Sequence, residues 1–402
     1  MHVPGWHEAT KELQAAGKLQ MLGILQEQHP DRARLFMQWK RMHWPLLVDS
    51  LNLLDVPYVP ITLAIDEHGV IRYIHPQPAD LQEFLARDYP RPTDAPPAQT
   101  RLPNLNELRA TARREDTAAA WRAYANALVT WGNPEQLDEA IAAYQRALAL
   151  VPDHGPTHFR LGVAYRKRYD SDLRRPGDFQ RAVEEWAAAL QTDPNQYIWR
   201  RRIQQYGPRL DKPYPFYDWV NTARRDIRAR GEAPVELRVE PGGAEFAHPA
   251  RTFATREPPQ EEPDPEGRIY RDQRGFVQVE TVVVPPRLAP GQSARVHVLF
   301  RPNLDILAHW NNEVGDDLVF WVNPPAGWEV DTRALSVANP PQPVSQETRK
   351  VEFEVRSPED APPGPVTLPG YALYYVCEDV NGVCLYRRQD VTLTLAVRPP
   401  DR

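Results

Sequence analysis

Cys377 and Cys384 are the residues best suited to chemistry in this sequence, which holds 2 cysteines among its 402 residues. The segment EDVNGV separates them, and strand-like apolar segments lie on both sides. A four-residue loop from Asp379 to Gly382 would place the cysteines opposite each other in a hairpin, within reach of a disulfide. A two-residue turn at Asn381-Gly382 would instead put Cys384 opposite Asp379. The sequence leaves both registers open.

Three roles for the cysteine pair remain open at this point. A redox-active disulfide needs an accessible sulfur and surroundings that favour a thiolate. A structural disulfide would be buried and inert, and two free thiols would be expected in a reducing cytoplasm. Glu378 and Asp379 disfavour a thiolate at Cys377, because nearby negative charges raise the pKa of a thiol. Arg387 and Arg388 are the cations that could offset this effect.

The sequence gives little support for other kinds of chemistry. The 11 histidines are scattered without metal-ligand spacing, and no phosphate-binding glycine loop or nucleophile elbow occurs. His309 falls in an expected loop of the carboxy-terminal region, where a structural role suits it. The net charge of −6 argues against a nucleic-acid partner, and no long apolar stretch predicts a membrane span. We therefore expect no metal and no cofactor.

Residues 1–92 have the alternating pattern of an α/β domain. Apolar spacing and end signals predict helices and short buried strands. Glu67-His68-Gly69 predicts a tight turn that makes a hairpin of two of the strands. The expected helices cover 6–16, 30–42 and 79–88, and the expected extended segments cover 18–26, 44–49, 59–66 and 69–74.

The order of these elements, with VPIT (59–62) opening a strand and IDEHGVI (65–71) turning into the next, resembles the redoxin and TlpA-like branch of the thioredoxin superfamily. The resemblance implies a cis peptide bond at Pro60, beside an active-site disulfide. The alternative is an ordinary trans proline at the start of a strand, and the surrounding pattern favours cis. That family carries a Cys-x-x-Cys pair where its first active-site helix begins, which is about Trp6 here. No cysteine precedes Cys377.

Two explanations of the missing pair follow. We expect that the domain lacks its amino-terminal part, because without its central strand the sheet would be left open. The alternative is a degenerate fold that has lost its chemistry. If the domain lacks its amino-terminal part, its oxidoreductase activity would depend on a Cys-x-x-Cys in the missing upstream segment. The expected compartment is the cytoplasm if Met1 is the true start, and the periplasm or another extracytoplasmic space if a signal peptide lies upstream.

Residues 93–114 predict a proline-rich linker, and residues 115–232 predict a helical domain. AIAAYQRALALVPD (140–153) and AVEEWAAALQTDPN (182–195) align position for position, and they resemble tetratricopeptide repeats. The resemblance implies a surface that binds a protein partner, while a helical spacer is the alternative. Residues 196–230 are expected to cap the repeats, and Arg200–Arg202 to form a solvated helix face.

Residues 233–402 predict an immunoglobulin-like β-sandwich, because short alternating strands are separated by turn signals. The expected strands cover 235–240, 276–284, 294–300, 318–323, 350–355, 371–377 and 384–397.

Parts of this region resemble the amino-terminal domain of the DsbD thiol–disulfide interchange proteins. The resemblance rests on YYVC (374–377), CLY (384–386), LAPGQSARVHVLF (288–300) and the segment from AHWNN to PPAGWEV (308–330), and it spans roughly residues 280–397. That family carries its exchanging cysteines on such a hairpin. Its usual spacing is one residue shorter.

Together these patterns predict three parts: an incomplete thioredoxin-like domain, tetratricopeptide-type repeats and an immunoglobulin-like domain. The expected function is thiol–disulfide redox chemistry with a protein partner, in which Pro60 shapes one site and Cys377 and Cys384 relay electrons. The redox role is favoured over a structural one because a thioredoxin-like segment shares the chain. The alternative is a non-catalytic scaffold whose cysteines form a structural disulfide.

Overall fold

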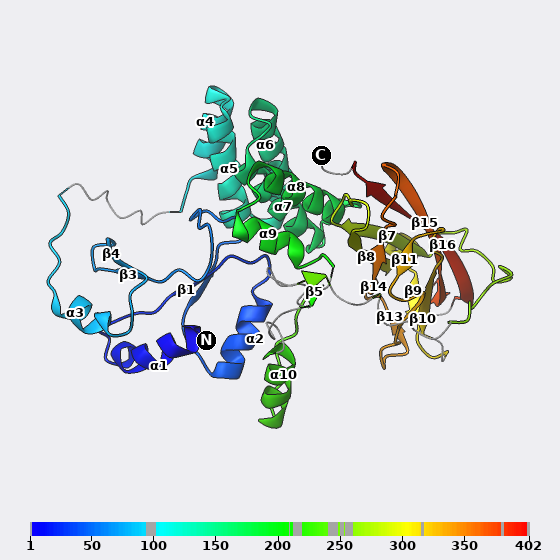
Figure 1. Cartoon of the computed structure of the whole chain (residues 1–402), viewed down its shortest axis with the longest axis horizontal. Helices are drawn as coiled ribbons and strands as arrows, with labels where there is room; N and C mark the ends of the chain where they lie inside the picture. Colours follow the sequence, from blue (N-terminus) through cyan, green and yellow to red (C-terminus); the bar gives the residue numbers. More distant parts are fainter. Residues whose placement is uncertain are drawn as a thin grey trace. The chain divides into compact units, whose positions relative to one another are not determined.

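The chain, seen in a computed structural model, divides into two compact units (Figure 1). Unit 1 is Met1–Lys167, Ala188–Arg202 and Tyr214–Pro241, and unit 2 is Arg168–Ala187, Ile203–Pro213 and Gly242–Arg402. The chain combines helices with several antiparallel sheets, as the sequence predicts at that level. The structure describes residues 2–93, 102–208, 210–211, 219–239, 248–249, 253, 260–314, 317–378 and 382–399.

The amino-terminal part of unit 1 contains two separate two-stranded sheets. β1 and β2 pair in parallel, whereas β3 and β4 form an antiparallel hairpin. Asp66 closes the hairpin, because its carboxylate accepts hydrogen bonds from the backbone N–H groups of His68 and Val70. The elements are α1 (His2–Ala15), β1 (Gly23–Leu25), α2 (Asp31–Lys40), β2 (Leu46–Val48), β3 (Leu63–Ile65), β4 (Ile71–Ile74) and α3 (Asp80–Ala86).

Apolar side chains of these short strands remain exposed. Among the described residues, no strand joins the β1–β2 pair to the β3–β4 pair. Ile24 on β1, Leu47 on β2, Ile65 on β3 and Ile74 on β4 are all exposed. Two-stranded sheets bury little apolar surface, so these strands leave unpaired edges and uncovered side chains.

The helical segment begins earlier than the sequence predicts. Helix α4 (Leu105–Glu115) occupies the second half of the expected linker 93–114, and residues 94–101 lie outside the described part. Asn104 caps α4, since its side chain accepts hydrogen bonds from two backbone N–H groups of the first turn. The helices that follow are α5 (Ala118–Trp131), α6 (Leu137–Leu150), α7 (Gly155–Tyr169), α8 (Asp178–Thr192), α9 (Tyr197–Gln204) and α10 (Trp219–Ala229).

Helix α10 packs on α2 in unit 1. Leu35 of α2 and Val220, Ala223 and Ile227 of α10 form one buried cluster. Val235 and Leu237 pack against the same cluster, and the described residues 235–239 are not in a strand. The expected strand at 235–240 is therefore wrong, because its apolar residues cover helices instead of pairing in a sheet.

The expected solvated helix face at Arg200–Arg202 is wrong for Arg202. Its side chain is buried, with 1% exposure. The guanidinium donates hydrogen bonds to the Gln28 side chain at 2.8 Å, to the Gln26 carbonyl at 3.2 Å and to the Ser50 carbonyl at 3.1 Å. Those carbonyls follow the ends of β1 and β2. A buried guanidinium needs acceptors, and these carbonyls provide them.

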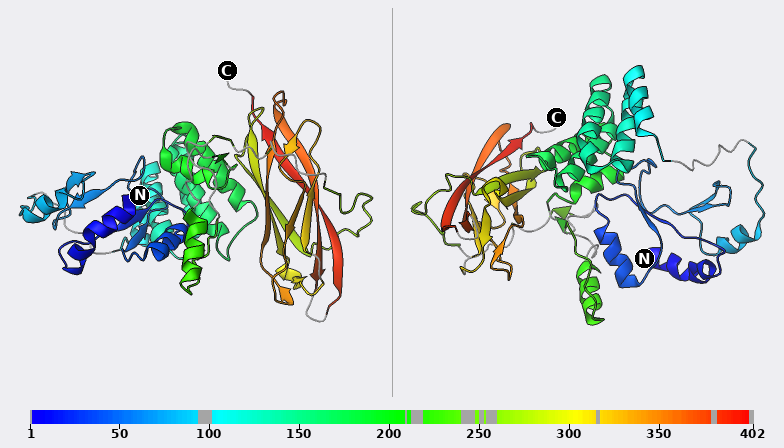
Figure 2. Two further views of the ribbon diagram at one scale, coloured as in Figure 1. Left: turned by 60° about the horizontal axis from the view of Figure 1, so that its bottom comes forward. Right: turned by 180° about the vertical axis from the view of Figure 1, so that it is seen from behind.

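Two large antiparallel sheets of unit 2 lie against each other as layers (Figure 2), and a separate pair joins β5 (Leu210–Asp211) to β6 (His248–Pro249). One sheet has the order β11-β14-β8-β7. The other has the order β12-β10-β15-β9-β13, and β16 also pairs with β15. The strands are β7 (Val277–Val284), β8 (Ser293–Pro302), β9 (His309–Asn311), β10 (Leu318–Val322), β11 (Glu329–Val330), β12 (Ala334–Val337), β13 (Val344–Ser345), β14 (Arg349–Arg356), β15 (Gly364–Cys377) and β16 (Cys384–Val397).

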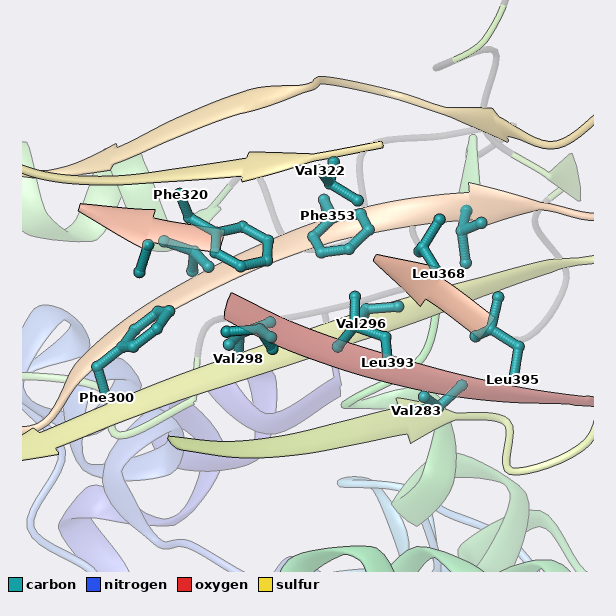
Figure 3. Packing of buried hydrophobic residues seen from close by; sticks show 14 of the residues in the cluster. Val283, Val296, Val298, Phe300, Phe320, Val322, Phe353, Leu368, Leu393 and Leu395 are labelled. Carbon is teal, nitrogen blue, oxygen red and sulfur yellow. The ribbon is translucent and has the colours of Figure 1, made fainter. Parts of the chain in front are cut away.

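The core of unit 2 lies between these two sheets (Figure 3). Alternate residues of each strand point into it, as the two-residue period of a strand requires. Val296, Val298 and Phe300 of β8 meet Phe320 of β10, and the Phe300 and Phe320 rings are 5.9 Å apart. This core fixes which face of β15 and β16 points away from the interior.

Helical residues of unit 2 cover the outer face of the β7–β8 sheet. The Phe179 ring lies 5.5 Å from the His297 ring and 5.0 Å from that of Tyr206. Arg301 of β8 donates a 2.8 Å hydrogen bond to the Tyr169 hydroxyl. Residues 168–187, expected to belong with the repeats, thus pack against the β-domain.

Candidate redox site at the Cys377–Cys384 hairpin

The hairpin of β15 and β16 ends at a disulfide between Cys377 and Cys384. The strands pair without interruption from Gly364 and Val397 at the open end to the two cysteines. Their Cα atoms are 4.2 Å apart. The register is the directly opposed one, and the alternative that places Cys384 opposite Asp379 is wrong. Residues 379–381 lie outside the described residues.

The two cysteines differ in their contact with solvent. Cys377 is 2% exposed, whereas Cys384 belongs to the exposed residues. Thiol–disulfide exchange depends on which sulfur an incoming thiolate can reach. Attack at Cys384 is thus favoured by access, and Cys377 would be the sulfur that leaves.

His309 lies directly beside Cys377 on the other side of β15. In the β9–β15 pair Cys377 faces His309, and the next pair is Val376 with Trp310. Val376 and Trp310 belong to the core, so His309, Cys377 and Cys384 form a row on the opposite face of the sheet. His309 lies in a strand and not in the expected loop.

The negative charge next to Cys377 is compensated by an arginine that the sequence did not point to. Arg274 donates hydrogen bonds to both carboxylate oxygens of Glu378, at 2.8 and 2.5 Å. Arg388, one of the two expected cations, is bonded instead to Asp264 and Asp390. Hence the penalty of Glu378 on a Cys377 thiolate is reduced, because the carboxylate is paired.

The segment before β7 places Arg274. Asp272 donates its backbone N–H to the Arg388 carbonyl at 2.8 Å, and Arg388 donates to the Tyr270 carbonyl at 3.0 Å. The segment therefore runs along the edge of β16. The Asp272 carboxylate also accepts a bond from the Tyr374 hydroxyl at 2.9 Å, and burial raises the pKa of Tyr374. These contacts hold the segment in place, and Arg274 follows Asp272 by two residues.

Arg387, the other expected cation, has a separate environment. Its guanidinium lies 5.9 Å from the Tyr270 ring, and it donates a hydrogen bond to the Tyr386 carbonyl. In the register Arg387 pairs with Tyr374, three positions from the cysteine pair and on the other face of the sheet. Two tyrosines, Tyr375 and Tyr386, lie next on the cysteine face with ring centroids 4.4 Å apart.

Pro60 belongs to unit 1, whereas Cys377 and Cys384 belong to unit 2. The Val59–Pro60 peptide bond is cis, in agreement with the expectation from the sequence. The preceding Tyr58 is exposed and stacks on His75 with ring centroids 6.2 Å apart. The structure thus brings Cys377 and Cys384 together, while Pro60 belongs to the other unit.

Within the described residues, no group of three or more His, Cys, Asp or Glu side chains could hold a metal ion. None of the helices in that part of the chain is long and apolar enough to cross a membrane.

Comparisons with known proteins do not assign a family. No protein-family model matches the sequence, and no curated protein matches it. Among solved structures, a protein of unknown function from Porphyromonas gingivalis W83 is similar at 19% identity over 31% of this chain and 48% of that one, with a TM-score of 0.20. The sporulation control protein Spo0M from Bacillus subtilis is similar at 13% identity over 31% and 51%, with a TM-score of 0.17. The chain spans about half the length of both proteins.

Proposed function

We propose that this protein exchanges thiols and disulfides with a partner protein through Cys377 and Cys384. The observation that carries the proposal is the disulfide between one buried and one exposed cysteine at the free end of a long hairpin. The paired charge of Glu378 supports it further, because an unpaired carboxylate would oppose a thiolate nearby.

The reaction follows from the accessible sulfur. A partner thiolate attacks the Sγ of Cys384, a new S–S bond forms, and the Cys377 Sγ leaves with the electron pair as a thiolate. The second thiol of the partner, once deprotonated, attacks the partner's sulfur in this mixed disulfide. The partner then leaves oxidised, and Cys384 leaves as a thiolate. Two electrons have passed from the partner to the pair, and the reverse sequence returns them.

The other parts of the chain are proposed to serve this exchange. We infer that residues 1–92 are thioredoxin-like, with Pro60 shaping a site, and that the helices of 115–232 are tetratricopeptide-type and bind the partner. The cis bond at Pro60 and the consecutive helices α5 to α8 support this view. The two packed sheets of unit 2 support an immunoglobulin-like domain similar to that of DsbD.

A structural disulfide is the second candidate, and the burial of Cys377 favours it. For so short a loop, a disulfide contributes about 2 kcal/mol to the free energy of unfolding. The hairpin is already held by its unbroken ladder of backbone pairs from Gly364 to Cys377. A structural disulfide would therefore add stability to a hairpin that its backbone pairing already stabilises.

Single cysteine variants test the direction of attack. Cys377→Ser leaves the exposed Cys384, which we expect to form a lasting mixed disulfide with oxidised glutathione, because no second cysteine can release it. Cys384→Ser leaves the buried Cys377, which we expect to react at least about tenfold more slowly, because access limits it. Mass spectrometry of the folded proteins measures both rates. Equal slow reaction of both variants would contradict the proposal.

A further inference from the structure

We propose that His309 holds the proton exchanged by Cys377 and stabilises the Cys377 thiolate when the disulfide opens. This inference rests on the proposed function and adds a third residue to its site. It assigns a chemical task to a buried histidine in strand β9, where the sequence favoured only a structural role.

The position of His309 follows from the strand register. Residues directly opposite in an antiparallel pair have Cβ atoms about 4.5–5.5 Å apart and project from the same face. Cys377 has two such neighbours, His309 on β9 and Cys384 on β16. His309 and Cys377 are therefore neighbours on one face of the sheet, and His309 stands on the side of Cys377 away from Cys384.

The hydrogen bond of His309 selects its neutral tautomer. The Nδ1 atom lies 3.4 Å from the Leu307 carbonyl, which can only accept. Nδ1 consequently carries the hydrogen, and Nε2 is left as the basic nitrogen. The side chain is 6% exposed, and a charge interaction in such surroundings is stronger than one in water.

Among the described residues, the carboxylate nearest to Cys377 is paired, and Asp379 lies outside them. Glu378, which follows Cys377, is paired with Arg274 from the segment before β7. On β16, Arg387 belongs to the register position of Tyr374, three positions away from Cys377. His309, opposite Cys377 on β9, is thus the described group that is proposed to meet a Cys377 thiolate.

His309 takes and gives the proton that the exchange moves at Cys377. A partner thiol loses its proton to solvent and attacks Cys384 as a thiolate, and the Cys377 thiolate leaves beside His309. Nε2 of the neutral ring takes up a proton from solvent, and the ring then pairs with the thiolate or passes this proton to it. In the return direction, Nε2 takes the proton of the Cys377 thiol. The Cys377 thiolate then attacks the Cys384 sulfur of the mixed disulfide, and the partner leaves as a thiolate.

Titration of a single thiol tests this role without any exchange reaction. In the Cys384→Ser background, the absorbance of the Cys377 thiolate near 240 nm is followed against pH with and without His309→Gln. We expect the apparent pKa of Cys377 to rise by about one unit or more when the imidazole is lost. His297→Gln is the matched control, because His297 is a buried histidine of the other sheet, bonded to Glu352 and to the Tyr206 carbonyl. An unchanged Cys377 titration in His309→Gln would overturn the inference.

A second measurement covers the case in which His309→Gln does not fold. Nuclear magnetic resonance of the otherwise wild-type protein follows the His309 ring in the oxidised and reduced states. We expect a higher pKa of His309 in the reduced state, since a thiolate then lies beside it. Equal pKa values in both states would overturn the inference. A shifted titration in a protein that exchanges no thiols would instead retain the His309 contact and refute the proposed function.

Discussion

Cys377 and Cys384 occupy facing positions of one hairpin, yet they differ in exposure, and in the proposed exchange this difference gives each sulfur a separate task. In that exchange, access makes Cys384 the sulfur that is attacked. Burial would by itself disfavour a thiolate at Cys377, so that sulfur needs compensation from its neighbours. Arg274 supplies part of it by pairing with Glu378, and His309 is proposed to supply the rest.

A partly buried histidine of unit 1, His29, gives a pH dependence that can be measured. Burial, followed by the positive charges of Arg166 and Arg238, lowers the pKa of His29 from its ordinary 6.5 to about 2. Below pH 6.5 the unfolded chain takes up a proton at this residue and the folded chain does not. The stabilisation is therefore fully present above pH 6.5 and is lost progressively as the pH falls toward 2.

We expect the free energy of unfolding to fall by about 1 kcal/mol between pH 6.5 and 5.5 because of His29 alone. Urea unfolding at both pH values measures it, with His29→Gln as the reference that lacks the titrating group. If the wild-type protein and His29→Gln lost the same stability over this interval, the lowered pKa of His29 would be refuted.

At the scale of elements, the sequence predicts most helices and strands but not every partner. Helix α10 has an apolar side, and the sequence assigned it to the cap of the repeats. In the structure its apolar residues pack on Leu35 of α2, and Trp39 of α2 donates a 2.9 Å hydrogen bond to the Asp226 carboxylate. The period of the apolar residues determines that a face is buried, but it carries no information about which distant element covers that face.

The α2–α10 contact predicts a large effect of one buried side chain. Ile227 of α10 is fully buried in this cluster, so Ile227→Ala should lower the free energy of unfolding by about 2–5 kcal/mol. The neighbouring Arg228 is exposed, and Arg228→Ala should change it by less than about 0.5 kcal/mol. Urea unfolding compares the two variants. Equal small effects would show that α10 does not depend on α2.

At the scale of the whole molecule, the candidate site combines what the sequence reveals with what it cannot. The cysteines and their hairpin follow from local spacing, because the strand pattern and the short loop leave only two registers. Arg274 and His309 do not follow, since they lie 104 and 68 positions before the residues that they approach, Glu378 and Cys377. Contacts of this kind are set by the order of strands in a sheet, which no local period encodes.

The measurement that tests the central claim most directly is an equilibrium of the folded protein with glutathione. The protein is incubated at a series of reduced-to-oxidised glutathione ratios, quenched with acid and alkylated, and the mass shift counts the free thiols. An exchanging pair should pass reversibly from oxidised to reduced, with a midpoint above about −300 mV. A pair that stays oxidised at every ratio while the protein remains folded would contradict the account and leave Cys377–Cys384 as a structural disulfide.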